Sequence, residues 1–321
     1  MPLNYSFLAL QSVIYSSYLA NSLKMLYQSD RPNWVSDKLA YSCSYGYGNP
    51  SGHSVTCAGA FLCLYHLIIK FFTFKKRTKI VFLIFYCIFL FLINISRFIL
   101  AAHSINQIIY GFTLGLGLYY MLIYIFEYHK YTSFEYLKHI RNKRVNYLYY
   151  FVHIVLLIIT ILIYLFTELK DVSYFEEKIF NGIRCKKKNL SVKYNGNGFF
   201  QSLSIIALIG SQMGINLLFF ILKKQNYMIN VSIVEWSKSK KIKNYFLRIP
   251  IVLLSSIGII LYFLFPNDTS LLLRFTFSSG VPFLLGSFGI HFIGIYLCIK
   301  FKIANNEIYK MDVLHEITAT A

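Results

Sequence analysis

The chain has 321 residues, of which 56% are hydrophobic and 14% are charged, and its mean hydropathy is +0.53. Soluble domains average about 25% charged residues, so this composition excludes a disordered chain and a soluble domain with a charged surface. The formal net charge of +19 would suggest an anionic partner in a soluble protein. In a membrane protein the positions of the charges must be considered before their sum.

Runs of about 20 mostly apolar residues, the length of a helix that crosses a bilayer, recur along the sequence. We expect an all-α membrane protein with about eight transmembrane helices, forming a single integral membrane domain over residues 1–321. The first run is the weakest, because several Ser, Gln and Asn residues interrupt it. The expected spans are Leu3–Tyr27, Ser54–Phe72, Ile80–Ser96, Ile105–Phe126, Tyr147–Phe166, Phe199–Leu222, Leu247–Phe265 and Leu271–Cys298.

The basic residues predict which side of the membrane each connection occupies. Of the 32 Lys and Arg residues, 20 lie in connections on one side, around residues 70–79, 127–146, 223–248 and 300–321. The positive-inside rule makes this side cytosolic and the opposite side lumenal or external. Most of the net charge therefore reflects topology, and we expect no nucleic-acid partner.

The six cysteines and the histidines show no spacing that suits zinc, and we expect neither a metal nor another cofactor. Cys43 and Cys185 both fall in lumenal connections, where an oxidising compartment would allow a disulfide. Two free thiols are the alternative, and the sequence does not decide between them.

Three clusters of polar residues fall at the lumenal ends of the first four spans. The first cluster runs from Lys24 to Arg31-Pro32. Basic residues near helix ends commonly extend toward the membrane interface, and this is the structural alternative for both side chains.

The second cluster, Gly48-Asn49-Pro50-Ser51-Gly52-His53, precedes the second span. It places backbone N–H groups at a helix N-terminus, where the helix dipole favours an anion. A plain Pro-Ser-Gly helix start with an incidental histidine is the alternative.

The third cluster lies between the third and fourth spans and contains Arg97, His103 and Gln107. An arginine at the boundary of an apolar span is a functional candidate, because inserting it costs free energy. Gln107 follows His103 by four residues, so on a helix its amide can reach and orient the imidazole. A packed histidine with satisfied hydrogen bonds is the alternative.

Together the clusters supply the groups that phosphoryl transfer requires. Lys24, Arg31 and Arg97 can neutralise phosphate oxygens, with Arg97 suited to bidentate contact. Two histidines can divide the roles of nucleophile and proton donor near neutral pH. The sequence therefore predicts a phosphate site at the lumenal membrane face.

The three clusters resemble the three-part signature of the type 2 phosphatidic acid phosphatase superfamily, in order and within residues 24–103. The lipid phosphatases of this superfamily usually carry Asp four residues after the final histidine. Gln107 stands at that position here, and the run Ser96–His103 followed by Gln107 is similar to the glucose-6-phosphatases. Cys43 and the long C-terminal part of the chain strengthen that likeness.

The resemblance implies a role for each matching residue. His103 would be the nucleophile that forms a phosphohistidine, and His53 would donate a proton to the leaving oxygen. The remaining residues would hold the phosphate: Lys24, Arg31, Ser51, Gly52 and Arg97. Gln107 would orient His103.

The resemblance also implies a wider context. It divides the chain into a core over residues 20–126 that carries the motifs and additional spans over residues 127–321. The family has nine spans, so the chain appears one helix short. The family implies the endoplasmic reticulum membrane, a lumenal active site, a place in gluconeogenesis and a sugar-phosphate transporter as a possible partner.

Three functions are compatible with these residues. The leading hypothesis is a membrane-bound phosphatase that hydrolyses glucose 6-phosphate. A second is a lipid or polyprenyl-pyrophosphate phosphatase with the same chemistry. A third, from a different class, is a non-catalytic phosphate-binding or transport protein. The presence of both His53 and His103 argues against the third, because a binding protein would not need both.

Overall fold

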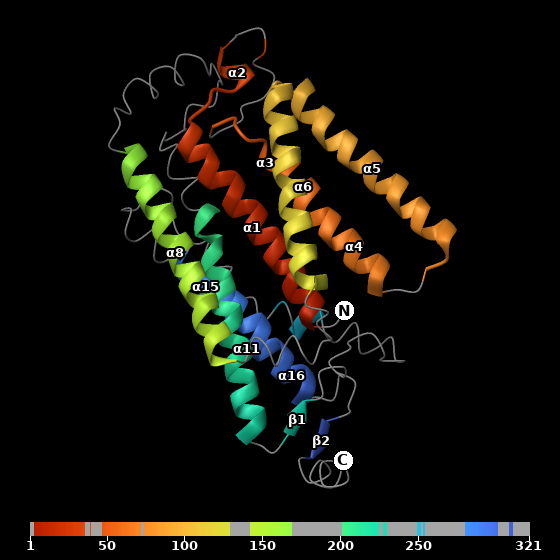
Figure 1. The fold of residues 1–321 in the computed structure, drawn as a ribbon, viewed down its shortest axis with the longest axis vertical. Helices are drawn as coiled ribbons and strands as arrows, with labels where there is room; N and C mark the ends of the chain where they lie inside the picture. The colour runs from red at the N-terminus through yellow and green to blue at the C-terminus, as the bar shows by residue number, and fades with distance from the viewer. Residues whose placement is uncertain are drawn as a thin grey trace. The chain divides into compact units, whose positions relative to one another are not determined.

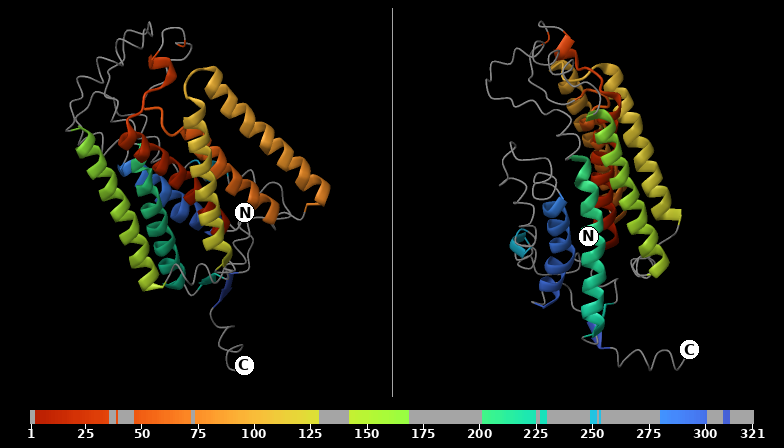
Figure 2. Two further views of the ribbon diagram at one scale, coloured as in Figure 1. Left: turned by 45° about the horizontal axis from the view of Figure 1, so that its top comes forward. Right: turned by 90° about the vertical axis from the view of Figure 1, so that its left-hand side faces the viewer.

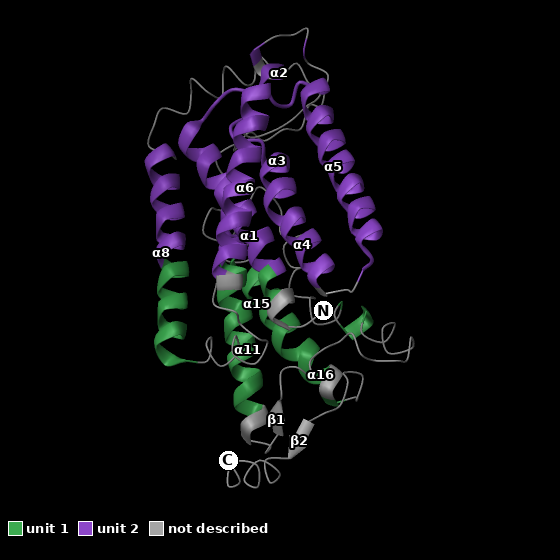
Figure 3. Ribbon diagram, turned by 45° about the vertical axis from the view of Figure 1, so that its right-hand side comes forward, with its two compact units in different colours: residues 1–8, 129–154, 206–321 green, residues 9–128, 155–205 purple. Residues whose placement is uncertain are grey.

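A computed structural model describes residues 3–35, 39, 47–71, 74–128, 142–168, 201–224, 227–229, 249–251, 253, 280–300 and 308–310. The chain divides into two compact units (Figure 3). Unit 2 comprises residues 9–128 and 155–205, and unit 1 comprises residues 1–8, 129–154 and 206–321. The three sequence clusters all lie in unit 2.

The described residues are mainly helical (Figure 1). The helices are α1 (Leu3–Tyr27), α2 (Pro32–Val35), α3 (Gly52–Thr56), α4 (Leu62–Phe71), α5 (Lys76–Ile99), α6 (Ile105–Tyr128), α8 (Lys143–Glu168), α11 (Ile206–Lys224), α15 (Val281–Gly289) and α16 (Ile295–Lys300). Two π-helical turns, η2 (Cys57–Phe61) and η8 (Ile290–Gly294), and the 3₁₀ turn η3 (Leu203–Ile205) continue neighbouring helices. The strands β1 (Tyr227–Ile229) and β2 (Ile308–Lys310) form a short antiparallel pair, and the other described elements are helical, in agreement with the expected all-α class.

Five helices of the described residues are long and apolar enough to cross a membrane: Gly52–Lys70, Lys76–Ile99, Ile105–Ile125, Lys143–Thr167 and Leu203–Ile221. They coincide with five of the eight expected spans and support a membrane protein. Most of the seventh expected span lies outside the described residues. The eighth is described from Gly280 onward and contains a shorter apolar helix, Val281–Leu297. The count of eight is therefore not established.

Helix α1 occupies the whole of the first expected span but is not among those five. The polar side chains that weaken its apolar pattern point into the protein: Ser12 and Ser16 are fully buried, and Asn21 and Ser22 are almost so. The Ser12 hydroxyl donates to the carbonyl of Ala9 within the helix. α1 therefore buries several polar side chains inside the protein while residues such as Val13 stay exposed, and its low hydropathy follows from this packing.

Two glycines of α6 allow it to pack closely against the α3–η2 segment. A Cβ atom at Gly111 would lie 2.6 Å from the carbonyl oxygen of Ser51. One at Gly115 would lie 2.8 Å from the Cβ of Ala58 and 2.9 Å from the backbone nitrogen of Gly59. Small residues spaced by four let helix backbones approach closely in membranes. This contact fixes the start of α3 against the start of α6, where the second and third clusters lie.

Unit 1 contains a comparable contact between α11 and the α15–η8 segment. A Cβ atom at Gly214 would lie 2.8 Å from the carbonyl oxygen of Phe288. Amide side chains join α8 to α11 in the same unit, where Asn216 Nδ2 lies 3.3 Å from Asn146 Oδ1 and 3.2 Å from the hydroxyl of Tyr150. Hydrogen bonds of this kind hold membrane helices together.

Candidate phosphoryl-transfer site

Backbone hydrogen bonds join the three clusters at one end of unit 2. The amide of Gly48 donates to the carbonyl of Ser29, and the amide of Ser51 donates to the carbonyl of Gln107. The turn between α5 and α6 contains Ala101 in a left-handed conformation, with φ of 50°. Its carbonyl accepts the amide of Asn33 at 3.1 Å. Residues up to 78 positions apart are thereby brought into one site.

The imidazole of His103 is buried, with 2% of its surface exposed. Its Nδ1 atom lies 2.8 Å from the carbonyl oxygen of Gly48 and 3.4 Å from Oε1 of Gln107. Because both oxygens are acceptors, Nδ1 carries the proton and Nε2 carries the lone pair. The hydrogen bonds therefore prepare Nε2 to act as a nucleophile.

The guanidinium of Arg31 lies next to this nitrogen. Its Nη1 atom is 3.3 Å from Nε2 of His103 and donates to the carbonyl of Ala102 at 2.8 Å. Its Nη2 atom donates to the carbonyl of Tyr47 at 3.3 Å. Arg31 is itself buried, so a positive charge is held directly beside the nitrogen to which a phosphoryl group would bond.

The protonation state of His103 follows from these surroundings. Burial and the positive charges of Arg31 and Lys24 lower the pKa of His103 to about 3, although the hydrogen bonds to Gly48 and Gln107 act in the opposite direction. The imidazole is therefore neutral at physiological pH, as a nucleophile must be.

Gln107 is held by hydrogen bonds at both ends of its amide. Its Nε2 atom donates to the carbonyl of Asp30 at 2.8 Å, and its Oε1 accepts the amide of Ser104 at 3.2 Å. The side chain thus connects the first cluster to the start of α6. Its Oε1 faces Nδ1 of His103 in the orientation that the spacing of four residues predicts.

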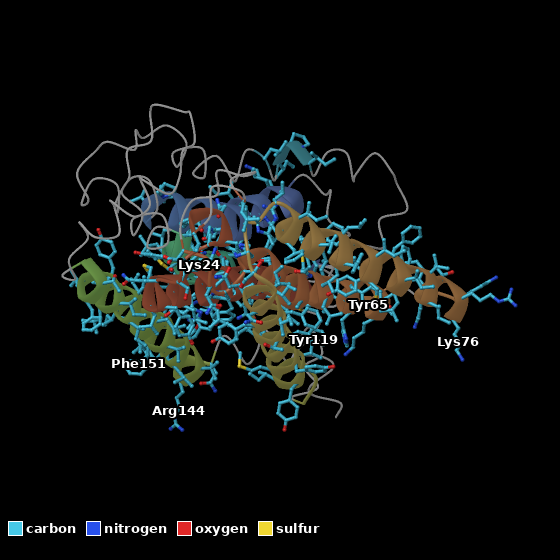
Figure 4. All side chains as sticks on the ribbon, turned by 90° about the horizontal axis from the view of Figure 1, so that it is seen from above. Lys24, Tyr65, Lys76, Tyr119, Arg144 and Phe151 are labelled. Carbon is cyan, nitrogen blue, oxygen red and sulfur yellow. The ribbon has the colours of Figure 1, made fainter. Side chains whose placement is uncertain are left out.

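Ser51 and Gly52 begin α3, close to the side chain of Lys24. The hydroxyl of Ser51 is fully buried and has no hydrogen-bond partner among the described residues. A Cβ atom at Gly52 would lie 3.3 Å from Nζ of Lys24, so glycine leaves room for that ammonium group. Figure 4 shows Lys24 among the helices, whereas Lys76 at the far end of α5 projects away from them. A buried donor without a partner fits an oxyanion site.

Arg97 and His53 complete the set with fewer direct contacts. Nε of Arg97 is buried and has no hydrogen-bond partner in the described part of the chain, while its carbonyl accepts the amides of Ala102 and His103. His53 is exposed, and the described structure contains no direct hydrogen bond from its ring to another predicted site residue. It lies within electrostatic range of Arg97, Lys24 and Arg31.

Gly48 contributes to the site in a way that the sequence did not indicate. Its carbonyl fixes the tautomer of His103, and a Cβ atom here would lie 2.6 Å from Nε2 of Gln107 and 2.8 Å from the carbonyl oxygen of Asp30. The position thus requires glycine because of close approach. A glycine directly before the Asn-Pro-Ser-Gly-His run was visible, but every residue has a carbonyl, so its role was not.

Comparison with known families agrees with this geometry. Residues 6–131 match the PAP2 superfamily, and the chain therefore contains a PAP2 superfamily domain over these residues. All of the predicted site residues fall within it, and members of this superfamily are generally phosphatases. No curated protein and no solved structure matches the chain significantly. The described residues contain no group of three or more His, Cys, Asp or Glu side chains that could hold a metal ion.

Proposed function

We propose that the protein is a membrane-bound phosphatase that hydrolyses a sugar phosphate, most specifically glucose 6-phosphate, through a phosphohistidine at His103. One observation carries the chemical part of this proposal. The tautomer of a buried imidazole is fixed through Nδ1, and the lone pair on Nε2 lies 3.3 Å from a buried guanidinium. A phosphoryl group that replaces this contact, with its phosphorus facing Nε2 and its oxygens on the guanidinium, would meet both nucleophile and charge neutralisation.

In the first step, Nε2 of His103 attacks phosphorus and the bond between phosphorus and the sugar oxygen breaks. Protonated His53 gives its proton to the departing oxygen, so the sugar leaves as a neutral alcohol. Lys24, Arg31 and Arg97 stabilise the negative charge on the three transferring oxygens. The hydroxyl of Ser51 and the backbone N–H of Gly52 add hydrogen-bond donors, whereas the backbone N–H of Ser51 already donates to the carbonyl of Gln107.

In the second step, water attacks the phosphohistidine and the bond between Nε2 and phosphorus breaks. Neutral His53 accepts a proton from the water, so each histidine returns to its starting state when phosphate leaves. The exposure of His53 suits this role, because it must exchange protons with both an alcohol and water.

The choice of a sugar phosphate depends on Gln107 and on the length of chain beyond the PAP2 domain. A neutral amide stands where lipid phosphatases of the superfamily usually carry Asp, and residues 132–321 extend past the matched region. A lipid or polyprenyl pyrophosphate remains the second candidate, because the phosphate ligands serve either substrate. We further propose a lumenal site in the endoplasmic reticulum membrane, with a sugar-phosphate transporter as partner.

A phosphate-release assay on membranes that contain the protein tests the proposal. Glucose 6-phosphate, mannose 6-phosphate, phosphatidic acid and dolichyl pyrophosphate are compared, with His103→Ala membranes as the control. We expect the highest kcat/KM for glucose 6-phosphate and no release by the variant. A preference for either lipid would replace the proposed substrate, and no release from any substrate would favour the non-catalytic alternative.

A further inference from the structure

Helix α5 carries Arg97 but packs weakly along its length. None of its residues, all of which the structure describes, is buried. Figures 1 and 2 show that α5 and α6 are joined at one end and separate toward their other ends. To bind a phosphate productively, a guanidinium must be held within about 0.5 Å of its ideal position, and this requires support from its surroundings. Some other contact must therefore hold Arg97 in place.

Contacts between α5 and the α3–η2–α4 segment follow one face of α5. The hydroxyl of Tyr86 donates to the carbonyl of Cys57 at 2.8 Å, and the ring of Phe89 meets that of Phe61 edge to face, with centroids 5.6 Å apart. Arg97 follows Tyr86 by 11 residues, about three helical turns, and so lies on the same face. These contacts hold the middle of α5 against the α3–η2–α4 segment, about three turns from Arg97, and do not themselves fix its side chain.

A further contact lies one turn before Arg97. The hydroxyl of Ser54 donates to Oδ1 of Asn94 at 2.5 Å. The amide nitrogen of Asn94 donates to the carbonyl of Leu90 at 2.9 Å, which orients the side chain and leaves Oδ1 toward Ser54. Since Ser54 directly follows His53, this bond joins the neighbours of two predicted site residues.

Ser54 also lies against α6. It is fully buried, and a Cβ atom at Gly111 would lie 3.1 Å from its Cβ. The serine therefore stands between α5, which carries Arg97, and α6, whose start carries Gln107. A shift of its hydrogen bond to Asn94 would change how these elements meet.

We propose that Asn94 is a positioning residue, which acts through Ser54 to set the distance between the guanidinium of Arg97 and the imidazole of His53 during phosphoryl transfer. The inference rests on the proposed function and deepens it. It applies to a sugar phosphate and to a lipid phosphate alike, because it concerns the phosphate group that both share.

A purely structural role predicts different kinetics from a positioning role. If the bond between Ser54 and Asn94 only joins helices, its loss lowers the amount of folded protein, and the apparent kcat falls while KM is unchanged. If the bond positions Arg97, its loss weakens contacts to the phosphate itself. KM, kcat and the inhibition constant of vanadate, an oxyanion that adopts five-coordinate geometry, then change together.

The test compares Asn94→Ala and Ser54→Ala with the unmodified protein, both in membranes and in detergent. We expect kcat/KM to fall about ten- to a hundredfold in each, with a similar rise in the inhibition constant of vanadate. The double variant should be no worse than either single variant, because both remove one bond. Tyr86→Phe is the matched control: it removes a hydrogen bond of α5 about 16 Å from Arg97, and should lower the melting temperature without changing KM or vanadate inhibition.

Combination with Arg97→Lys shows whether Asn94 acts through Arg97. Asn94→Ala should lower kcat/KM much less in the Arg97→Lys background, since the bidentate contact of the guanidinium is already lost there. Additive losses, or an unchanged vanadate constant in both single variants, would overturn the inference. If the unmodified protein releases no phosphate, the proposed function fails. The inference about Asn94 is then tested by how much vanadate raises the melting temperature of each variant. A smaller increase in Asn94→Ala than in Tyr86→Phe supports it, and equal or absent increases refute it.

Discussion

At the scale of single residues, a carbonyl and an amide orient the imidazole of His103. Gly48 and Gln107 both accept from Nδ1, so the tautomer is fixed without a carboxylate at that nitrogen. Neither acceptor has a full negative charge, and burial with two nearby cations holds the pKa of His103 at about 3. His103 is therefore already neutral, as the proposed nucleophile must be, and Arg31 lies beside its Nε2.

Replacing His103 tests the nucleophile directly. We expect His103→Ala to abolish phosphate release and to remove an acid-labile, base-stable phosphoenzyme that brief incubation with ³²P-labelled substrate would otherwise leave. The physical reason is that Nε2 of His103 forms the covalent bond to phosphorus in the proposed mechanism. Persistent labelling of the variant at the original level would show that another residue is the nucleophile.

Replacing Arg31 should change the pH dependence. The positive charge of Arg31 helps to lower the pKa of His103, so Arg31→Gln raises that pKa toward the ordinary value of 6.5. A larger fraction of His103 is then protonated and inactive at acidic pH. We expect the ratio of variant to unmodified kcat/KM to fall as the pH decreases from 7 to 4, measured on one substrate so that its own ionisation cancels. A constant ratio would contradict the coupling.

At the scale of elements, the site depends on how closely α6 approaches the start of α3. Gly111 and Gly115 let the two backbones meet, and the π-helical turn η2 lies at the same contact. Single π-helical turns within α-helices are often found at functional sites. The backbone bond from Ser51 to Gln107 then holds the predicted phosphate-binding start of α3 beside the end of α6 that follows His103.

A methyl group at Gly111 should separate these helices. Gly111→Ala places a Cβ 2.6 Å from the carbonyl oxygen of Ser51, so we expect at least a tenfold loss of kcat/KM and a destabilisation of about 1–3 kcal/mol. Gly117→Ala is the control, since its Cβ would meet nothing within 4 Å and alanine favours a helix. Kinetics and melting temperatures in detergent measure both. Equal behaviour of the two variants would show that close approach at Gly111 is not required.

At the scale of the whole molecule, we expect the basic start of α5 and the predicted site to lie on opposite sides of the membrane. Lys76 and Arg77 begin α5 in a connection that the positive-inside rule makes cytosolic. The opposite end of α5 and the start of α6 hold Arg97 and His103. If these helices cross the membrane, the predicted site faces away from the cytosol, which is the basis for a lumenal reaction.

Single cysteines at the two ends test this topology. Lys76 and Asn106 are both exposed, and Lys76→Cys and Asn106→Cys are placed separately in a background whose native cysteines are replaced by Ser. A membrane-impermeant maleimide is added to cells whose plasma membrane alone is permeabilised. It should label position 76 at once and position 106 only after the internal membranes are opened. Labelling of both positions before opening would contradict the assignment.

The sequence determined the parts of the fold that follow from local pattern. Five apolar runs predicted membrane-spanning helices, because a long apolar run requires a helix in lipid, and the bounds expected for the first run are those of α1. Likewise, the residue types and spacing of the three clusters indicated phosphate chemistry, and the PAP2 match over residues 6–131 supports that class. Cys43, Cys185 and most of the seventh expected span lie outside the described residues, and what the sequence indicates about them stays a prediction.

Tertiary structure decided what no local pattern contains. The carbonyl of Gly48 is visible as an acceptor only once residues 55 positions apart meet. The bond between Ser54 and Asn94, and the burial of polar residues in α1, likewise depend on helix packing. Hydropathy and motif spacing identify which groups are present, because they are properties of neighbouring residues. The positions of those groups depend on contacts between distant helices, which sequence order alone does not specify.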